Sequence, residues 1–183
     1  MSRLSAFSPE EREIIISLPY RAGLHVSYAD DEGGEQDDEQ EMKALEACIR
    51  ELAKAHEKSP LIVEISDEIL NAQDKWETWT QGVFNIEPQC KQAVAILKDK
   101  VGKDERKQYK LMVMSVASAV AQAYGEFGED IKEPDSGFFG GVMKRIVGGM
   151  SGAPEEAANH PMNVSATEDD AIARIKAALT TDE

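Results

Sequence analysis

An uncharged stretch near the middle of the chain places the strongest constraint on the fold. Residues 111–123 contain no charged residue, no glycine and no proline, although 30% of the chain is charged. Apolar or small side chains would face every side of a helix built from this stretch, which predicts a buried helix surrounded by others. A membrane-spanning helix needs about 20 apolar residues, and this stretch is shorter. We therefore expect a central core helix here and not a membrane span.

The rest of the chain has the spacing of apolar residues that is typical of helices, and no segment alternates as a strand would. Ser8, Pro9 and Glu11 form a capping box with proline at the first helical position. Pro19 lies inside this first helix and removes one backbone hydrogen-bond donor, so we expect a kink there. Further helices are predicted to begin near residues 38, 60, 88, 104, 138 and 167.

Together these helices predict an all-α fold, in which one domain over residues 1–183 is a bundle of about seven helices around the buried one. The helix that begins at residue 60 is expected to run unbroken to Gly82. Residues 149–166 are rich in glycine, proline and alanine, which predicts a flexible loop. A last, C-terminal helix is expected over residues 167–180.

Two turns that follow mostly apolar helices are similar to each other. The first helix leads into Ala29 and Asp30, which are followed by glycines and acids. The central helix leads into residues 123–126, which read Ala-Tyr-Gly-Glu. We interpret this similarity as a sign of two pseudo-repeated halves, with both acidic turns at one end of the bundle.

The charge of the chain limits the kinds of partner that it can bind. Lys plus Arg number 20 against 35 for Asp plus Glu, which gives a net charge of −15. Such a charge repels nucleic acids and favours cations or basic partners. Cys48 and Cys90 stand alone within helical patterns, so a disulfide framework is not expected. With neither a signal peptide nor a transmembrane run, the sequence predicts a cytoplasmic protein.

The acidic turns are the main candidates for a binding site. Residues 30–41 contain eight carboxylates in twelve positions, and carboxylate oxygens suit Ca²⁺ or Mg²⁺. The spacing differs from that of an EF-hand loop. The alternative is that these acids are a solvated loop that caps the next helix. The candidate metal ligands are Asp30, Glu35, Asp38, Glu126 and Glu129.

No arrangement of residues typical of a catalytic site occurs in the sequence. The three histidines are His25, His56 and His160, and none of them pairs with a second ligand at metal-binding spacing. We therefore expect a protein that is not an enzyme and that binds a protein partner. The alternative is a metal-dependent hydrolase that uses the clustered carboxylates. The segment Phe138–Met150 is expected to be either a short core helix or a peripheral contact with a membrane surface.

At these turns the chain resembles the tellurite-resistance TerB-like family, whose marker is an Ala-Asp-Gly turn followed by acids. Ala29 and Asp30 match the first two positions, and Gly33 follows after two additional acids. In the second half, the turn from Ala123 has the same spacing, with Tyr124 in place of the aspartate. The pattern covers residues 9–148.

The resemblance implies an all-helical, cytoplasmic and non-catalytic module. Members of this family are linked to tellurite resistance and to other stress responses. They are thought to bind a divalent metal through the acidic turns and to recruit protein partners near the inner membrane surface. These properties are expectations for this chain.

Overall fold

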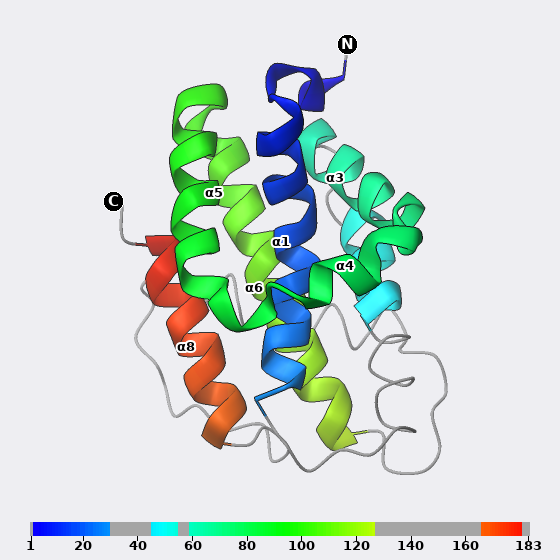
Figure 1. Cartoon of the computed structure of the whole chain (residues 1–183), viewed down its shortest axis with the longest axis vertical. Helices are drawn as coiled ribbons and strands as arrows, with labels where there is room; N and C mark the ends of the chain where they lie inside the picture. Colours follow the sequence, from blue (N-terminus) through cyan, green and yellow to red (C-terminus); the bar gives the residue numbers. More distant parts are fainter. Residues whose placement is uncertain (1, 30–44, 55–58, 127–165, 181–183) are drawn as a thin grey trace.

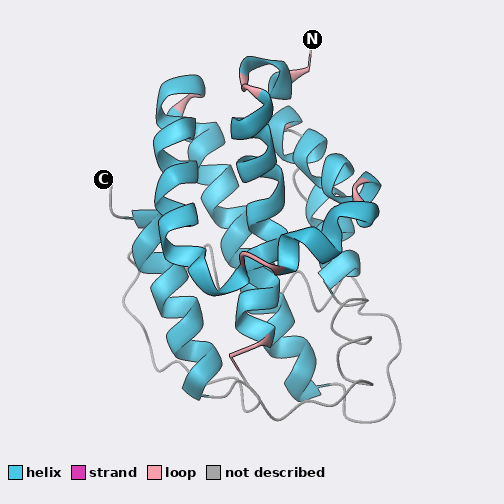
Figure 2. Ribbon diagram, viewed as in Figure 1, coloured by secondary structure: helices cyan, strands magenta, loops and turns pink. Residues whose placement is uncertain are grey.

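The computed structural model describes residues 2–29, 45–54, 59–126 and 166–180. Every regular element in these ranges is a helix, which confirms the predicted all-α class (Figure 2). The α-helices are α1 (Pro9–Ser27), α3 (Pro60–Asn71), α4 (Trp76–Thr80), α5 (Ile86–Lys100), α6 (Lys103–Glu126) and α8 (Ala166–Thr180), together with a helical segment over 45–54. Short 3-10 helices are η1 (Arg3–Ala6), η2 (Gln73–Lys75) and η3 (Val83–Asn85).

Helices α1 and α6 form the centre of the bundle. They pack against each other more extensively than any other pair of described elements. Helices α5 and α8 pack together on one side of this pair, and α3 packs on the other side (Figure 1). Helix α6 is therefore surrounded by other helices, as the sequence predicts.

The middle of α6 is buried along its whole circumference. From Tyr109 to Ala121 every side chain is buried except that of Ser118, which is half-buried. The polar side chains in this stretch include Ser115, whose hydroxyl donates to the Leu111 carbonyl at 2.7 Å. A helix without a polar face has to be enclosed, because its apolar surface would otherwise meet water on some side.

The start of α1 follows the sequence closely. The Ser8 hydroxyl accepts a hydrogen bond from the Glu11 backbone at 3.2 Å, and the Glu11 carboxylate accepts one from the Ser8 backbone at 2.7 Å. This is the predicted capping box, and Pro9 occupies the first turn. Local chemistry is enough to begin this helix, since both partners lie within four residues.

The prediction of one unbroken helix from residue 60 to Gly82 is wrong. Helix α3 ends at Asn71, and Ala72 leaves the helical conformation with φ −99° and ψ 31°. The chain then turns through η2 into α4, which packs on α1. This break lets Trp79 reach α1, where its indole donates to Glu13 at 2.6 Å and its ring lies 5.5 Å from that of Tyr20. Contacts with another helix override the local helical pattern.

The predicted C-terminal helix over 167–180 is confirmed by α8. The expected helix within Phe138–Met150 and all but the last residue of the expected loop over 149–166 lie outside the described residues. Among the described helices, none combines the length and apolar character that crossing a bilayer requires. The relation between two repeated halves stays a prediction.

Candidate functional site

Most of the predicted metal ligands lie outside the described residues. These are Asp30, Glu35, Asp38 and Glu129. Glu126 is the last residue of α6. Ala29 is the last described residue before the first acidic run, so the structure places the point from which Asp30 departs.

The ends of α1 and α6 lie at the same end of the bundle because the two helices run in parallel. The Tyr109 hydroxyl donates to the Ile15 carbonyl at 2.9 Å, which sets residue 15 level with residue 109. This is an offset of 94 residues, and further along Gly23 lies against Val116 and Val120. Figure 1 shows both helices running from the end that carries the N-terminus towards the opposite end.

The same offset relates the residues at which the two similar stretches of sequence begin. Adding 94 to residue 29 gives residue 123, and both are alanines, but the turn predicted at residues 123–126 is wrong, because α6 continues through these residues to Glu126. Helix α1 ends at Ser27, with Tyr28 as its C-cap, and α6 ends at Glu126. The described chain before each acidic run thus ends at the same end of the bundle.

Pro19 explains why Tyr109 bonds to the first helix. In a regular helix the Ile15 carbonyl accepts from the backbone N–H of residue 19, and proline has none. Both Ile15 and Tyr109 are fully buried, so water cannot supply the missing donor. The Tyr109 hydroxyl supplies it instead, and burial raises the pKa of this phenol well above its usual value. The hydroxyl is therefore a neutral donor that fixes the register of α6 on α1.

Gly23 allows the close approach of α1 and α6 near the acidic end. A methyl group added at Gly23 would lie 2.8 Å from Leu45 Cδ1, 3.0 Å from Val116 Cγ1 and 3.2 Å from Val120 Cγ2. These distances are shorter than normal van der Waals contacts, so the site has no room for a side chain. The sequence analysis missed Gly23, although a glycine within an apolar helical pattern is a recognised sign of close packing.

Aromatic side chains lie on the surface near the end of α1. Tyr28 and Phe84 stack with ring centroids 6.2 Å apart, and they are 43% and 81% exposed. One turn earlier, the His25 ring nitrogen Nδ1 lies 3.0 Å from the Val83 carbonyl. Burial lowers the pKa of His25, so the ring is neutral at pH 7 and acts in packing η3 against α1. Tyr28, one member of this aromatic pair, lies two residues before the first acidic run.

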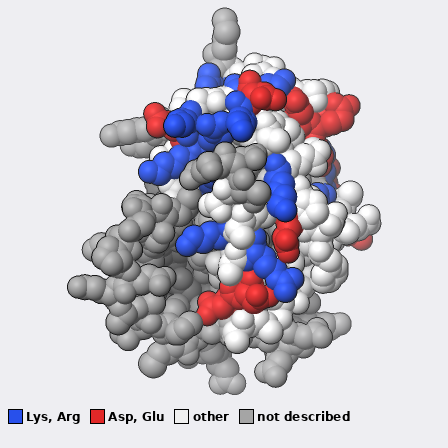
Figure 3. Space-filling view, turned by 90° about the vertical axis from the view of Figure 1, so that its left-hand side faces the viewer, with Lys and Arg blue, Asp and Glu red and all other residues white. Residues whose placement is uncertain are grey.

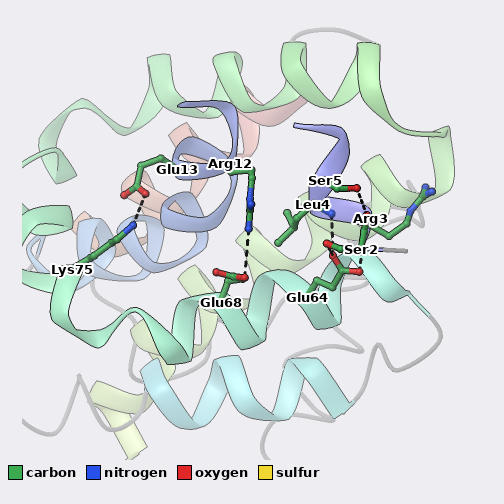
Figure 4. A network of polar contacts seen from close by, with 9 residues as sticks. All are labelled: Ser2, Arg3, Leu4, Ser5, Arg12, Glu13, Glu64, Glu68 and Lys75. Atoms are coloured by element: carbon green, nitrogen blue, oxygen red, sulfur yellow. Dashed lines mark hydrogen bonds and ion pairs between the residues drawn. The ribbon is translucent and has the colours of Figure 1, made fainter. Parts of the chain in front are cut away.

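A polar network joins the N-terminus and α1 to α3 on the side of the bundle away from α5 (Figure 4). The Glu64 carboxylate accepts from the backbone of Arg3 at 2.8 Å, from the backbone of Leu4 at 2.9 Å and from the Ser2 hydroxyl at 2.7 Å. Burial alone would raise the pKa of Glu64, but these donors together lower it. The carboxylate has a structural role, since it holds η1 on α3.

Arg21 of α1 also has a structural role, because it binds the connection between α4 and α5. Its Nε donates to the Trp79 carbonyl at 3.0 Å, and its Nη1 donates to the Gln89 side chain at 2.8 Å. Gln89 in turn donates to the Gly82 carbonyl at 2.8 Å. This guanidinium therefore has a structural role, since its Nε and Nη1 bind oxygens of the chain itself.

The candidate nucleophiles are also in structural positions. Cys48 and Cys90 are buried free thiols, and burial raises the pKa of both. A thiol with a raised pKa is protonated at pH 7 and is a poor nucleophile. Within the described ranges, no group of three or more His, Cys, Asp or Glu residues is arranged to hold a metal ion.

Comparison of the chain with protein-family models, with curated proteins and with solved structures found no match. The TerB-like resemblance therefore rests on the residues of the two turns and stays a prediction.

Proposed function

We propose that this chain is a non-catalytic helical module of the TerB-like kind, which binds one divalent cation between its two acidic turns and recruits a protein partner there. The supporting observation is the parallel packing of α1 and α6. It sets Ala29 level with residue 123, three residues before the end of α6, so both helices end at the same end of the bundle. Carboxylates from two distant parts of the sequence can then contribute to one site.

The chemistry of these turns suits a hard cation. Ca²⁺ takes six to eight oxygen ligands at about 2.3–2.6 Å, and Mg²⁺ takes six at about 2.0–2.1 Å. The proposed ligands are Asp30, Glu35, Asp38, Glu126 and Glu129. Crowded carboxylates repel one another, so a bound cation would relieve this repulsion and stabilise the folded chain.

The partner is proposed to bind beside the same turns. Phe84 is the most exposed large apolar side chain among the described residues, and it stacks on Tyr28. Exposed aromatic rings next to acidic residues favour a basic partner, because arginine and lysine interact both with rings and with carboxylates. Because both would bind at the acidic turns, the cation and the partner would either compete for the same carboxylates or bind there at the same time.

Calorimetric titration with Ca²⁺, Mg²⁺ and Zn²⁺ tests the cation site. We expect binding heat for Ca²⁺ or Mg²⁺ and a rise in melting temperature, because ligand at 100 times its Kd adds about 2.7 kcal/mol of stability. The variant D30N/D38N should lose most of this binding. The control D67N/D74N removes the same charge from exposed positions elsewhere and should bind like the wild type.

Two results would contradict the proposal. One is the absence of both binding heat and a shift in melting temperature at millimolar cation. The other is turnover in a phosphatase and nuclease screen with Mn²⁺ that the D30N/D38N substitution abolishes, since this would favour the metal-dependent hydrolase instead.

A further inference from the structure

The end of α5 and the first turns of α6 together have a charge opposite to that of the chain as a whole. Residues 98–110 contain six basic and three acidic residues, in a chain with a net charge of −15. Lys103, Arg106 and Lys107 lie at the spacing i, i+3 and i+4, so they share one face of the helix. We call these three residues the basic stripe.

The basic stripe is not neutralised by the described part of the protein. Two of the nearby acids are already paired: Glu105 bonds to Arg3, and Glu11 lies 3.3 Å from Lys100. None of the three stripe residues forms an ion pair or a side-chain hydrogen bond with any residue that the structure describes. Lys103 and Lys107 are exposed, and Arg106 is half-buried. Lys and Arg side chains gather near the top of the face drawn in Figure 3.

The basic stripe is far from the acidic turns. Helix α6 begins at Lys103 and reaches residue 123 about 30 Å further on, at 1.5 Å per residue. The screening length at physiological ionic strength is about 8 Å. An approaching anion therefore meets the local positive charge of the stripe and not the negative charge of the whole chain.

We propose that the basic stripe docks an acidic helix of a partner protein. Lys103 and Lys107 are one turn apart, about 6 Å along the axis. A partner helix with glutamates at i and i+4 presents carboxylates at the same interval. Asp99 and Asp104 lie among these cations in the sequence. Discrete carboxylates of a partner can pair with the lysines and avoid these two acids, whereas a flat anionic surface would meet the acids as well.

A membrane or a nucleic acid fits the basic stripe less well. Attraction to anionic lipid is about 1 kcal/mol for each lysine or arginine, and clusters of four to eight are typical of lipid-binding segments, whereas the stripe has three and the nearby Lys100 is paired with Glu11. Nucleic-acid binding likewise depends on many phosphate contacts. Three cations on one turn suit a small acidic segment of a protein. This inference is independent of the proposed cation site, which lies at the other end of the bundle.

NMR titration of the full ¹⁵N-labelled chain, in the presence of EDTA, tests the inference. The probe is a synthetic alanine-based helix with glutamates at i and i+4, and its control carries glutamines at the same positions. We expect the glutamate peptide to shift the amide signals of residues 98–107, with an affinity that falls as salt is added. The glutamine peptide should cause no shift.

A matched pair of variants locates the binding. K103Q/K107Q should weaken binding of the glutamate peptide about three- to tenfold, because each exposed ion pair contributes only modestly to the binding free energy. K91Q/K176Q removes two other exposed lysines and should leave the affinity unchanged. Equal weakening in both variants, no binding by the wild type, or binding of phosphatidylserine vesicles or duplex DNA in place of the peptide would overturn the inference.

Discussion

Replacing Tyr109 with phenylalanine removes one hydroxyl group from the buried contact between α6 and α1. The Ile15 carbonyl then loses the donor that stands in for the N–H that Pro19 lacks. A buried carbonyl without a partner costs about 1–3 kcal/mol, so we expect Tyr109→Phe to lower the free energy of unfolding by about 2 kcal/mol. For a chain of this size, that corresponds to a fall in melting temperature of about 4–8 °C.

A double-mutant cycle tests the reason for this loss as well as its size. In a Pro19→Ala background, residue 19 has a backbone N–H that can bond to the Ile15 carbonyl. Removing the Tyr109 hydroxyl then leaves the Ile15 carbonyl with a hydrogen-bond donor. The loss in free energy of unfolding caused by Tyr109→Phe should therefore be at most half of its value in the wild-type background. The free energies come from urea unfolding of the four proteins, followed by circular dichroism.

Two outcomes would refute the reasoning. If Tyr109→Phe costs less than about 0.5 kcal/mol, the carbonyl is satisfied in another way. If the cost is the same in both backgrounds, the hydroxyl contributes through packing and Pro19 has no part in it. In either case the register of α6 on α1 would have to depend on other contacts.

Three further predictions concern other contacts of α1 and α3. Gly23→Val should destabilise the fold by about 1–3 kcal/mol, measured by urea unfolding, because its methyl groups would collide with Val116. Trp79→Phe should cost about 1–2 kcal/mol in the same assay, since it removes the indole donor to Glu13. Glu64→Gln should cost about 1 kcal/mol at neutral pH, after allowance for solvent screening. The pKa of Glu64 is lowered in the folded state, so the stability difference between the wild type and Glu64→Gln is fully present at pH values above the ordinary pKa of 4.5. It is lost as the pH falls through the folded-state pKa, which a pH series of melting curves would show.

The sequence by itself determined the fold class and the positions of several helices. The capping box at Ser8 and Glu11 acts within four residues, so it can be predicted without knowing what packs nearby. The apolar side chains of residues 111–123 can avoid water only if the helix is buried on all sides. This pattern therefore predicts that the helix lies at the centre of the bundle, as α6 does. The acidic run over residues 30–41 can be read from the sequence, and its role as a source of metal ligands stays a prediction.

The tertiary structure decided the features that depend on partners far along the chain. The break after Asn71 serves contacts of α4 with α1, which no local pattern records. The common end of α1 and α6 follows from their parallel packing, whose register is set by a hydrogen bond across 94 residues and by the close approach at Gly23. Local propensity contributes tenths of a kcal/mol per residue, whereas a buried acceptor or a steric overlap costs about 1–3 kcal/mol, so the long-range contacts prevail where the two disagree.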